Sequence, residues 1–250
     1  MRPRQQLDDV LRLCALGGSS REIARLTGIP ERTISHWRSG DRRRGPRERT
    51  RCARCGGPPI DPGAYAYLLG SYLGDGHITT GRRTLCLWIY CDDRWPGVRD
   101  EVAVAVRTVQ PTSKVGLVQR TGCTAVKSYS RHWHCHFPQH GAGPKHRRTI
   151  GLEPWQQEVV DRHTGRFLRG LFHSDGCRIS NWTRRRVAGE VKRYEYPRYF
   201  FTNKSDDILG LCADALTRLD IPFTRPRPDT ISAARRAAVA TLDVHVGPKA

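Results

Sequence analysis

Long apolar runs and acidic residues are both scarce in this sequence of 250 residues. No stretch reaches the roughly 18 apolar residues of a transmembrane helix, so we expect no membrane span. The N-terminus carries charge without an apolar run behind it, so we expect no signal peptide. The nine cysteines are odd in number and irregularly spaced, which argues against a disulfide framework and favours a reducing, cytoplasmic location.

The shortage of acid leaves a large positive charge. Lys and Arg number 43 against 24 for Asp and Glu, a net charge of +19, and most of the excess is arginine. Phosphate is a natural partner for such a surplus, because neutralising it releases counterions. Arginine also binds phosphate and guanine through two parallel hydrogen bonds. The composition therefore predicts binding to double-stranded DNA, although a GC-rich genome would also raise the arginine content.

Residues 1–40 have the pattern of a helix-turn-helix domain. Helices are predicted over Leu7–Leu16, Arg21–Leu26 and Glu31–Arg38, and Ser19 with Glu22 can form a capping box on the second. Helix, short glycine-containing turn, helix is typical of small DNA-binding domains. The alternative is a packing module whose basic face contacts only solvent. The side chains predicted to face the DNA groove are Arg32, Thr33, Ser35, His36 and Arg38.

Residues 41–63 are predicted to be a basic linker, because they are rich in charge and turn formers. Cys52 and Cys55 within it have the spacing of half a zinc ribbon, but no second Cys-x-x-Cys follows. Cys86 and Cys91 would point to opposite faces of a strand. Zinc at Cys52 and Cys55 is therefore the weaker interpretation.

A second group of metal-ligand types lies at residues 131–137, where His132, His134 and His136 alternate. On a strand these three side chains would share one face, and closing a tetrahedral site would need help from His140 or His146. We predict a polar strand face over DNA here instead of a metal site.

Residues 64–250 contain an internal duplication. Leu68–Gly76 and Leu168–Gly176 are apolar segments that each end in Asp-Gly, 100 residues apart. Each is followed by predicted strands, an amphipathic helix (Val98–Val109 or Ser205–Leu219) and more strands. The order predicts two repeats, residues 64–163 and 164–250.

The two apolar helices are predicted to pack against each other. Small residues stand four apart in each, at Gly70 and Gly74 and at Gly170 and Ser174, which allows close approach of two backbones. Asp75 and Asp175 would then lie together at the negative ends of two helix dipoles, where a divalent cation such as Mg²⁺ relieves their repulsion. The alternative is two ordinary exposed aspartates. Gly76 and Gly176 are placed to end the helices in the left-handed conformation.

These segments resemble the two motifs of the LAGLIDADG homing endonucleases, in the single-chain form. The resemblance implies an α+β fold in which two αββαββα halves pack through the motif helices. It implies that Asp75 and Asp175 bind the catalytic Mg²⁺, with Gly74, Gly76, Ser174 and Gly176 as motif backbone. Leu73 and His173 stand where the family often has an acid, outside the catalytic position.

The activity implied is site-specific hydrolysis of both DNA strands by a monomer, through metal-activated water. A basic residue assists in this family, and Lys145 is the candidate chosen, ahead of Lys204 and Arg236. The implied sheets form a saddle over the major groove. The expected DNA-binding side chains on this saddle are Arg82, Arg83, Arg178, Arg184, Arg186 and Arg193, with Arg185 and Lys192 nearby.

Two other functions agree with the same residues. A transcriptional regulator could keep the LAGLIDADG-like fold, joined to a helix-turn-helix, to bind DNA without cutting it. An RNA-splicing maturase is a weaker alternative. Intact Asp75 and Asp175 favour the endonuclease.

Overall fold

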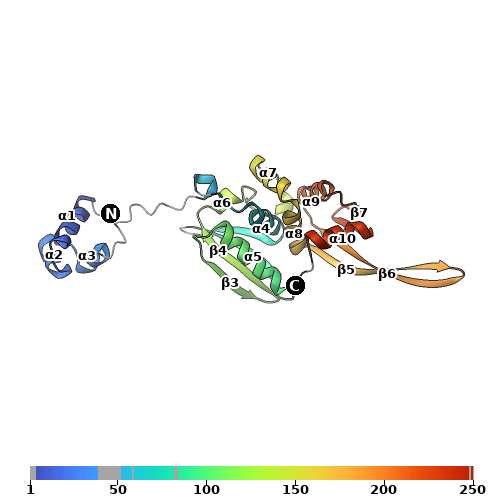
Figure 1. Ribbon diagram of the computed structural model, residues 1–250, viewed down its shortest axis with the longest axis horizontal. Helices are drawn as coiled ribbons and strands as arrows, with labels where there is room; N and C mark the ends of the chain where they lie inside the picture. The colour runs from blue at the N-terminus through green and yellow to red at the C-terminus, as the bar shows by residue number, and fades with distance from the viewer. Residues whose placement is uncertain (1–3, 39–51, 58, 82–83, 248, 250) are drawn as a thin grey trace. The chain divides into compact units, whose positions relative to one another are not determined.

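The computed structural model describes residues 4–38, 52–57, 59–81, 84–247 and 249, and the chain divides into two compact units between Arg51 and Cys52 (Figure 1). In the first unit the helices are α1 (Arg4–Ala15), α2 (Ser20–Thr27) and α3 (Glu31–Arg38). They enclose a small core of Leu7, Val10, Ile23, Ile29, Ile34 and Trp37.

Residues at the two ends of α2 determine where this helix begins and ends. The Ser19 side chain accepts a hydrogen bond from the Glu22 backbone, and the Glu22 side chain accepts one from the Ser19 backbone, which is the predicted capping box. Gly28 ends the helix at φ +66°, a conformation that a side chain disfavours.

The second unit repeats one order of elements twice. The first repeat contains α4 (Pro62–Asp75), β1 (Gly76–Thr80), β2 (Leu85–Asp92), α5 (Pro96–Val109), β3 (Val115–Arg120) and β4 (Cys123–Ser130). The second contains α8 (Thr164–Asp175), β5 (Gly176–Val187), β6 (Glu190–Thr202), α9 (Asp206–Arg218), β7 (Thr224–Arg227), β8 (Thr230–Ala233) and α10 (Arg236–His245). The antiparallel sheets have orders β1-β2-β4-β3 and β5-β6-β8-β7, so the predicted pseudo-symmetric α+β architecture is confirmed.

Shorter elements complete the unit. These are two 3-10 turns, η1 (Ala53–Cys55) and η2 (Lys145–Arg147), and the helices α6 (Trp133–His136) and α7 (Pro154–Arg162). None of the helices in the described ranges is long and apolar enough to cross a membrane.

Helices α4 and α8 pack backbone against backbone through their glycines. A Cβ placed on Gly70 would meet Leu171 N at 2.7 Å, and one placed on Gly170 would meet Ser71 N at 2.9 Å. Real Cβ atoms do not come so close to backbone, so only glycine allows this contact. The prediction from the small-residue spacing is confirmed, and the helix pair forms the centre of the buried core.

The prediction that Gly76 and Gly176 adopt the left-handed conformation is wrong. Both are extended, with φ, ψ of −92°, 150° and −99°, 163°, because each helix continues directly into a strand that begins at the glycine. Glycine is still required at these positions. A Cβ on either one would lie 2.6–2.7 Å from the Cα of Tyr72 or Phe172.

Two further expectations are corrected near the cysteine and histidine segments. Residues 131–137 do not form a strand, since Trp133–His136 is the short helix α6. Residues 52–57 do not behave as part of a linker, because they group with the second unit, and Pro62 and Gly63 already belong to α4.

A long hairpin distinguishes the second sheet. Strands β5 and β6 span 12 and 13 residues, most of them exposed, and Figure 1 shows the hairpin extending beyond the helices that cover the rest of its sheet. Its tip at Ala188 and Gly189 has positive φ at both residues, as tight hairpins require. Arg82 and Arg83, expected in the first hairpin, lie outside the described residues.

Candidate functional site

The tips of α4 and α8 bring two carboxylates together. Asp75 is the last residue of α4 and Asp175 is the last residue of α8. A Cβ on Gly74 would lie 2.9 Å from Asp175 Oδ2, so the glycine leaves the space that the second carboxylate occupies. The four residues predicted as motif backbone, Gly74, Gly76, Ser174 and Gly176, therefore flank the two aspartates at this junction.

The electrostatics at the tips are unfavourable to two negative charges. Asp75 is exposed, but the surrounding protein partly desolvates it, and this together with the charge of Asp175 raises its pKa to about 6. Desolvation also raises the pKa of Asp175, although Asn203 Nδ2 donates a 2.7 Å hydrogen bond to Asp175 Oδ2 and opposes the shift. Nearby cationic charge, protein or metal, would stabilise the charged pair.

Two lysines supply part of that charge. Lys145 Nζ donates to the carbonyls of Tyr72 (2.5 Å), Leu73 (2.9 Å) and Gly74 (2.8 Å), the last carbonyls of α4. Desolvation lowers its pKa to about 8, and Asp175 and Asp75 oppose this change. Lys249 Nζ donates to Ser174 O at 3.3 Å, near the end of α8. Each lysine thus binds the negative end of one motif helix.

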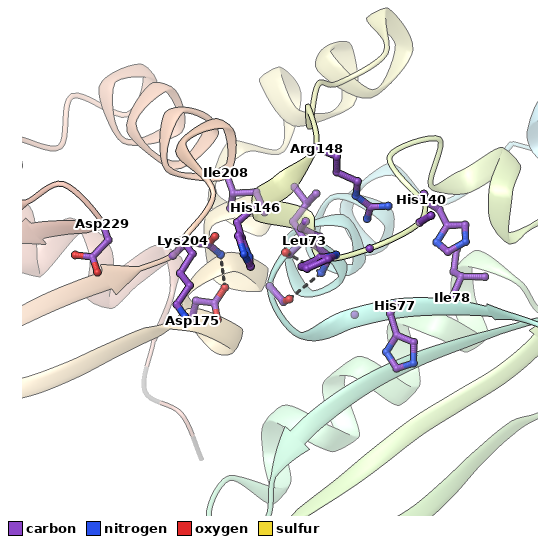
Figure 2. A pocket seen from close by; sticks show the side chains of 18 of the residues that line it. Leu73, His77, Ile78, His140, His146, Arg148, Asp175, Lys204, Ile208 and Asp229 are labelled. Atoms are coloured by element: carbon purple, nitrogen blue, oxygen red, sulfur yellow. Dashed lines mark hydrogen bonds between the residues drawn. The ribbon is translucent and has the colours of Figure 1, made fainter.

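Two open hollows flank the helix tips, and each contains one of the carboxylates. Asp175 and Lys145 line the first, together with Lys204 and His146. Figure 2 shows Asp175, Lys204 and His146 at one side of this hollow and His77 with His140 toward the other. Asp75 and Lys249 line the second hollow. Each carboxylate therefore shares a hollow with the lysine that binds the other motif helix.

The remaining sequence candidates fall into different places. Lys204 lines the first hollow, whereas Arg236 begins α10 and lines neither. Leu73 is buried in the helix interface. His173 is buried, its Nδ1 lies 3.1 Å from Tyr67 Oη, and desolvation lowers its pKa to about 4, so it is a neutral core residue.

Lys249 and Asn203 were not identified from the sequence. Lys249 stands next to the end of the sequence with no motif around it, and Asn203 follows β6. The signal for Asn203 is its position between a strand and the Ser205 cap of α9. There its Oδ1 accepts from the Ser205 backbone at 2.8 Å, and its Nδ2 remains available for Asp175.

The helix-free face of the first sheet is rich in aromatic side chains. His77 stacks on Tyr90 with ring centroids 5.6 Å apart, and Lys127 Nζ lies 5.6 Å above the Trp88 ring. The pairing register puts these side chains on the face opposite the buried Leu87 and Ile89; this open face comprises His77, Thr79, Trp88, Tyr90, Lys127 and Tyr129.

The register of the β5–β6 hairpin separates its basic residues into two groups. Arg184 pairs with Arg193 and Arg178 pairs with Tyr199, whose side chain is buried, so Arg178, Arg184, Arg186 and Arg193 continue the helix-covered face. The open face carries Arg185, Lys192, Arg198, Tyr194 and Tyr196.

Three of these arginines, Arg178, Arg184 and Arg193, also have partners within the protein. Arg178 forms a bidentate ion pair with Asp243 of α10, at 2.8 and 3.0 Å. Arg184 and Arg193 both lie over the Trp182 ring, at 5.4 and 5.0 Å from its centroid. The ion pair thus fixes Arg178 to α10, whereas Arg184 and Arg193 contact a residue of their own hairpin, Trp182, through the ring contacts described.

In the first unit, the third helix presents the predicted side chains on its outer surface. Arg32, Ser35, His36 and Arg38 are exposed and Thr33 is half-buried, whereas Ile34 and Trp37 fill the core. Arg38 Nη1 donates to Gly18 O at 3.2 Å.

Comparison with known proteins identifies the fold. No protein-family model and no curated protein sequence matches the chain. A crystal structure of I-DmoI in complex with DNA and Mn is similar over 74% of this chain and 97% of its own, with 13% identity and a TM-score of 0.50. The N-terminal LAGLIDADG domain of DUF199/WhiA matches over 76% of this chain and 83% of its own, with 12% identity and a TM-score of 0.47. The second unit has a LAGLIDADG homing-endonuclease-like fold.

Proposed function

We propose that this protein is a site-specific endonuclease that hydrolyses both strands of double-stranded DNA with a divalent metal ion, Mg²⁺ being the expected one. The observation that carries the proposal is the pair of carboxylates at two packed helix ends, each open to a hollow that also holds a lysine. Two carboxylates in two hollows suit two scissile phosphates, one on each strand. The fold agrees, since a solved structure of similar fold is a complex with DNA and Mn.

The residues at the helix tips fit a hard divalent cation. Their donors are carboxylate oxygens, which Mg²⁺ and Mn²⁺ prefer, and their repulsion decreases when a cation binds between them. Among the described residues, no hydrogen bond occupies the Asp75 carboxylate, so its oxygens are available. The bound ion would polarise the scissile phosphate and activate water.

The chain's own residues would position the reaction. Asn203 fixes one oxygen of Asp175 and leaves the other for the ion. Lys145, held by three carbonyls, would place a cationic group near the phosphate charge in its hollow, and Lys249 would do so in the other.

We infer that DNA binds along the open faces of the two sheets, with the β5–β6 hairpin in a major groove. The side chains expected to touch it are Trp88, Lys127, Arg185, Lys192 and Arg198, and Arg184, Arg186 and Arg193 at the protruding end of the ribbon. The first unit would bind a second DNA segment through Arg32, Ser35 and His36 of α3. Because both repeats lie in one chain, we expect the protein to act as a monomer.

The test is cleavage of a randomised duplex library with Mg²⁺ or with a chelator. Wild type is expected to enrich one cut site, while Asp75→Asn and Asp175→Asn bind that site and cut at least about 10³-fold more slowly, the magnitude expected for a lost catalytic group. Asp214→Asn is the matched control, because Asp214 is exposed on α9 and lines neither hollow. Tight binding without any cutting by wild type would establish the regulator instead. A chain that binds no duplex would contradict both functions.

A further inference from the structure

Four side chains of metal-binding type converge on two turns of the second unit. The ligand atoms of Cys52, Cys55, His132 and Cys135 all lie within 4.8 Å of one another. Cys55 Sγ lies 3.7 Å from both Cys135 Sγ and His132 Nδ1, and Cys135 Sγ lies 3.9 Å from His132 Nδ1. None of the four lines either hollow at the helix tips.

These distances match the edges of a zinc tetrahedron. Zn–S bonds of about 2.3 Å and Zn–N bonds of about 2.0–2.1 Å place two sulfurs about 3.8 Å apart and a sulfur and a nitrogen about 3.6 Å apart. A disulfide would bring two sulfurs to about 2.05 Å of each other. The three cysteines of the cluster are free thiols. The arrangement is therefore one in which an ion fits between the side chains.

Each ligand pair lies on a helical turn of its own, Cys52 and Cys55 at η1 and His132 and Cys135 at α6. In η1 the Cys55 amide donates to Cys52 O at 2.8 Å, and Gly56 follows at φ +80°, so the chain reverses directly after the second thiol. The Cys135 amide donates to His132 O at 2.9 Å in the same way. Residues three apart on such a turn lie on one side, so each turn presents two ligands together.

The two turns differ in how the rest of the protein holds them. The α6 turn is anchored in the core by the buried Trp133, whose Nε1 donates to Ser128 O at 2.8 Å. The His136 carbonyl on the same turn accepts from Tyr65 Oη at 2.6 Å. Among the described residues, one side-chain contact outside the cluster anchors the η1 turn in this way: the Arg54 guanidinium lies over the Trp155 ring, 4.6 Å from its centroid. Its position thus depends largely on the cysteines.

We propose that Cys52, Cys55, Cys135 and His132 bind one structural Zn²⁺ that fastens the start of the second unit to α6. Three thiols lose their protons to solvent on binding, and neutral His132 coordinates through Nδ1 while Nε2 keeps its proton. Four protein ligands close the tetrahedron, so the site is structural and leaves no position for substrate. This site is separate from the carboxylate pair and does not depend on the proposed cleavage.

The test is the metal content of the full chain, expressed with zinc in the medium and purified without chelator. Wild type is expected to hold about one zinc per chain, and Cys55→Ser and Cys135→Ser less than about a tenth of that. Cys123→Ser is the matched control, because Cys123 lies at the start of β4 outside the cluster and should retain the zinc.

A second measurement on wild type does not depend on the variants folding. Zinc is removed with a chelator and replaced by Co²⁺, which is expected to give the absorption of a four-coordinate thiolate complex. Chelation should also speed trypsin cleavage after Arg54 by at least about tenfold, and Zn²⁺ should reverse this, because the turn opens when its metal leaves. Wild type without zinc, zinc retained by both serine variants, or iron with inorganic sulfide would each overturn the proposal.

Discussion

The two repeats are nearly equivalent where they meet and unlike where they surround the carboxylates. At the interface, Gly70 and Gly170 each rest on the backbone of the other helix. Around the tips, Asn203 binds Asp175, whereas among the described residues Asp75 has no such partner. Lys145 makes three hydrogen bonds to the end of α4, and Lys249 makes one to the end of α8.

The comparison shows that a duplicated site has two separate requirements, the contact between the helices and the environment of each carboxylate. Backbone contact between the helices sets how far apart the carboxylates are, so it tolerates no change in either copy. The groups around each carboxylate set its charge and its local environment, and these groups differ between the two repeats. In the proposed endonuclease the two carboxylates would act on different strands of an asymmetric DNA target. Three experiments test that separation.

The largest effect is expected from breaking the symmetric contact. Gly70→Ala and Gly170→Ala should each lower the free energy of unfolding by about 3 kcal/mol or more, because the new methyl group would overlap backbone atoms of the other helix. Chemical denaturation followed by circular dichroism measures this. The two losses should be similar.

Gly210→Ala is the matched control for these variants. Gly210 lies inside α9 with no atom within 4 Å of its added methyl group, so the substitution should raise stability by about 0.5–1 kcal/mol. If Gly70→Ala or Gly170→Ala were as stable as wild type, the close packing of α4 and α8 would be wrong.

An intermediate effect is expected from removing the lysines one at a time. Lys145 shares a hollow with Asp175 and Lys249 shares one with Asp75, so Lys145→Met and Lys249→Met should slow different strands, each by about 10²-fold. Single-turnover cleavage of a duplex labelled on both strands would show nicked product. Lys145→Met should have the larger effect, since Lys145 makes more contacts.

Lys192→Met is the control for the lysine pair, because Lys192 lies on the hairpin and lines neither hollow. It should weaken DNA binding, and the ratio of the cleavage rates of the two strands should stay the same as in wild type. Equal slowing of both strands by either Lys145→Met or Lys249→Met would show that the hollows do not act separately.

The smallest effect is the pH dependence of stability without metal. The folded pKa of Asp75, about 6, lies above its unfolded value of 3.8, so the folded state binds more protons between these values. Stability from this group is present below about pH 4 and is lost as pH rises through about 6. We expect a loss of about 1 kcal/mol in the free energy of unfolding. This is less than the full pKa shift corresponds to, because solvent in contact with Asp75 screens its charge.

Denaturation curves between about pH 4 and pH 7 measure this loss. Asp75→Asn should remove most of it and leave the contribution of Asp175, whose pKa is also raised, and Mg²⁺ should reduce it because the ion favours the charged form. Asp175→Asn should change the pH dependence less, because Asn203 already stabilises the Asp175 carboxylate. A larger change in Asp175→Asn than in Asp75→Asn would reverse the comparison.

The fold was accessible from the sequence because duplication leaves a strong pattern. Two apolar segments ending in Asp-Gly, each with glycine one turn earlier, predict the helix pair and its meeting point. Lys145 was a candidate among several bases, and only the fold brings it to the carbonyls at the end of α4. Lys249 reaches the site through tertiary structure alone, and the position of Asn203 before the Ser205 cap indicates a turn but not a contact with Asp175.

The cysteine and histidine cluster shows where periodicity misled. The alternation of the histidines predicts a strand, which would separate His132 from Cys135 across two faces. The spacing that mattered is three residues on a helical turn, repeated at Cys52 and Cys55. The left-handed prediction for Gly76 failed for a related reason, since a helix that continues into a strand needs no reversal of the chain.

The long β5–β6 ribbon has a consequence for how such a protein could acquire new targets. Twelve residues at about 3.3 Å each extend roughly 40 Å, more than the 34–36 Å of one turn of duplex DNA. The paired residues nearest its tip are not part of the buried core. In the proposed endonuclease, substitutions there would alter which bases are recognised on one flank and leave the carboxylate pair intact. Retargeting would therefore proceed one half-site at a time.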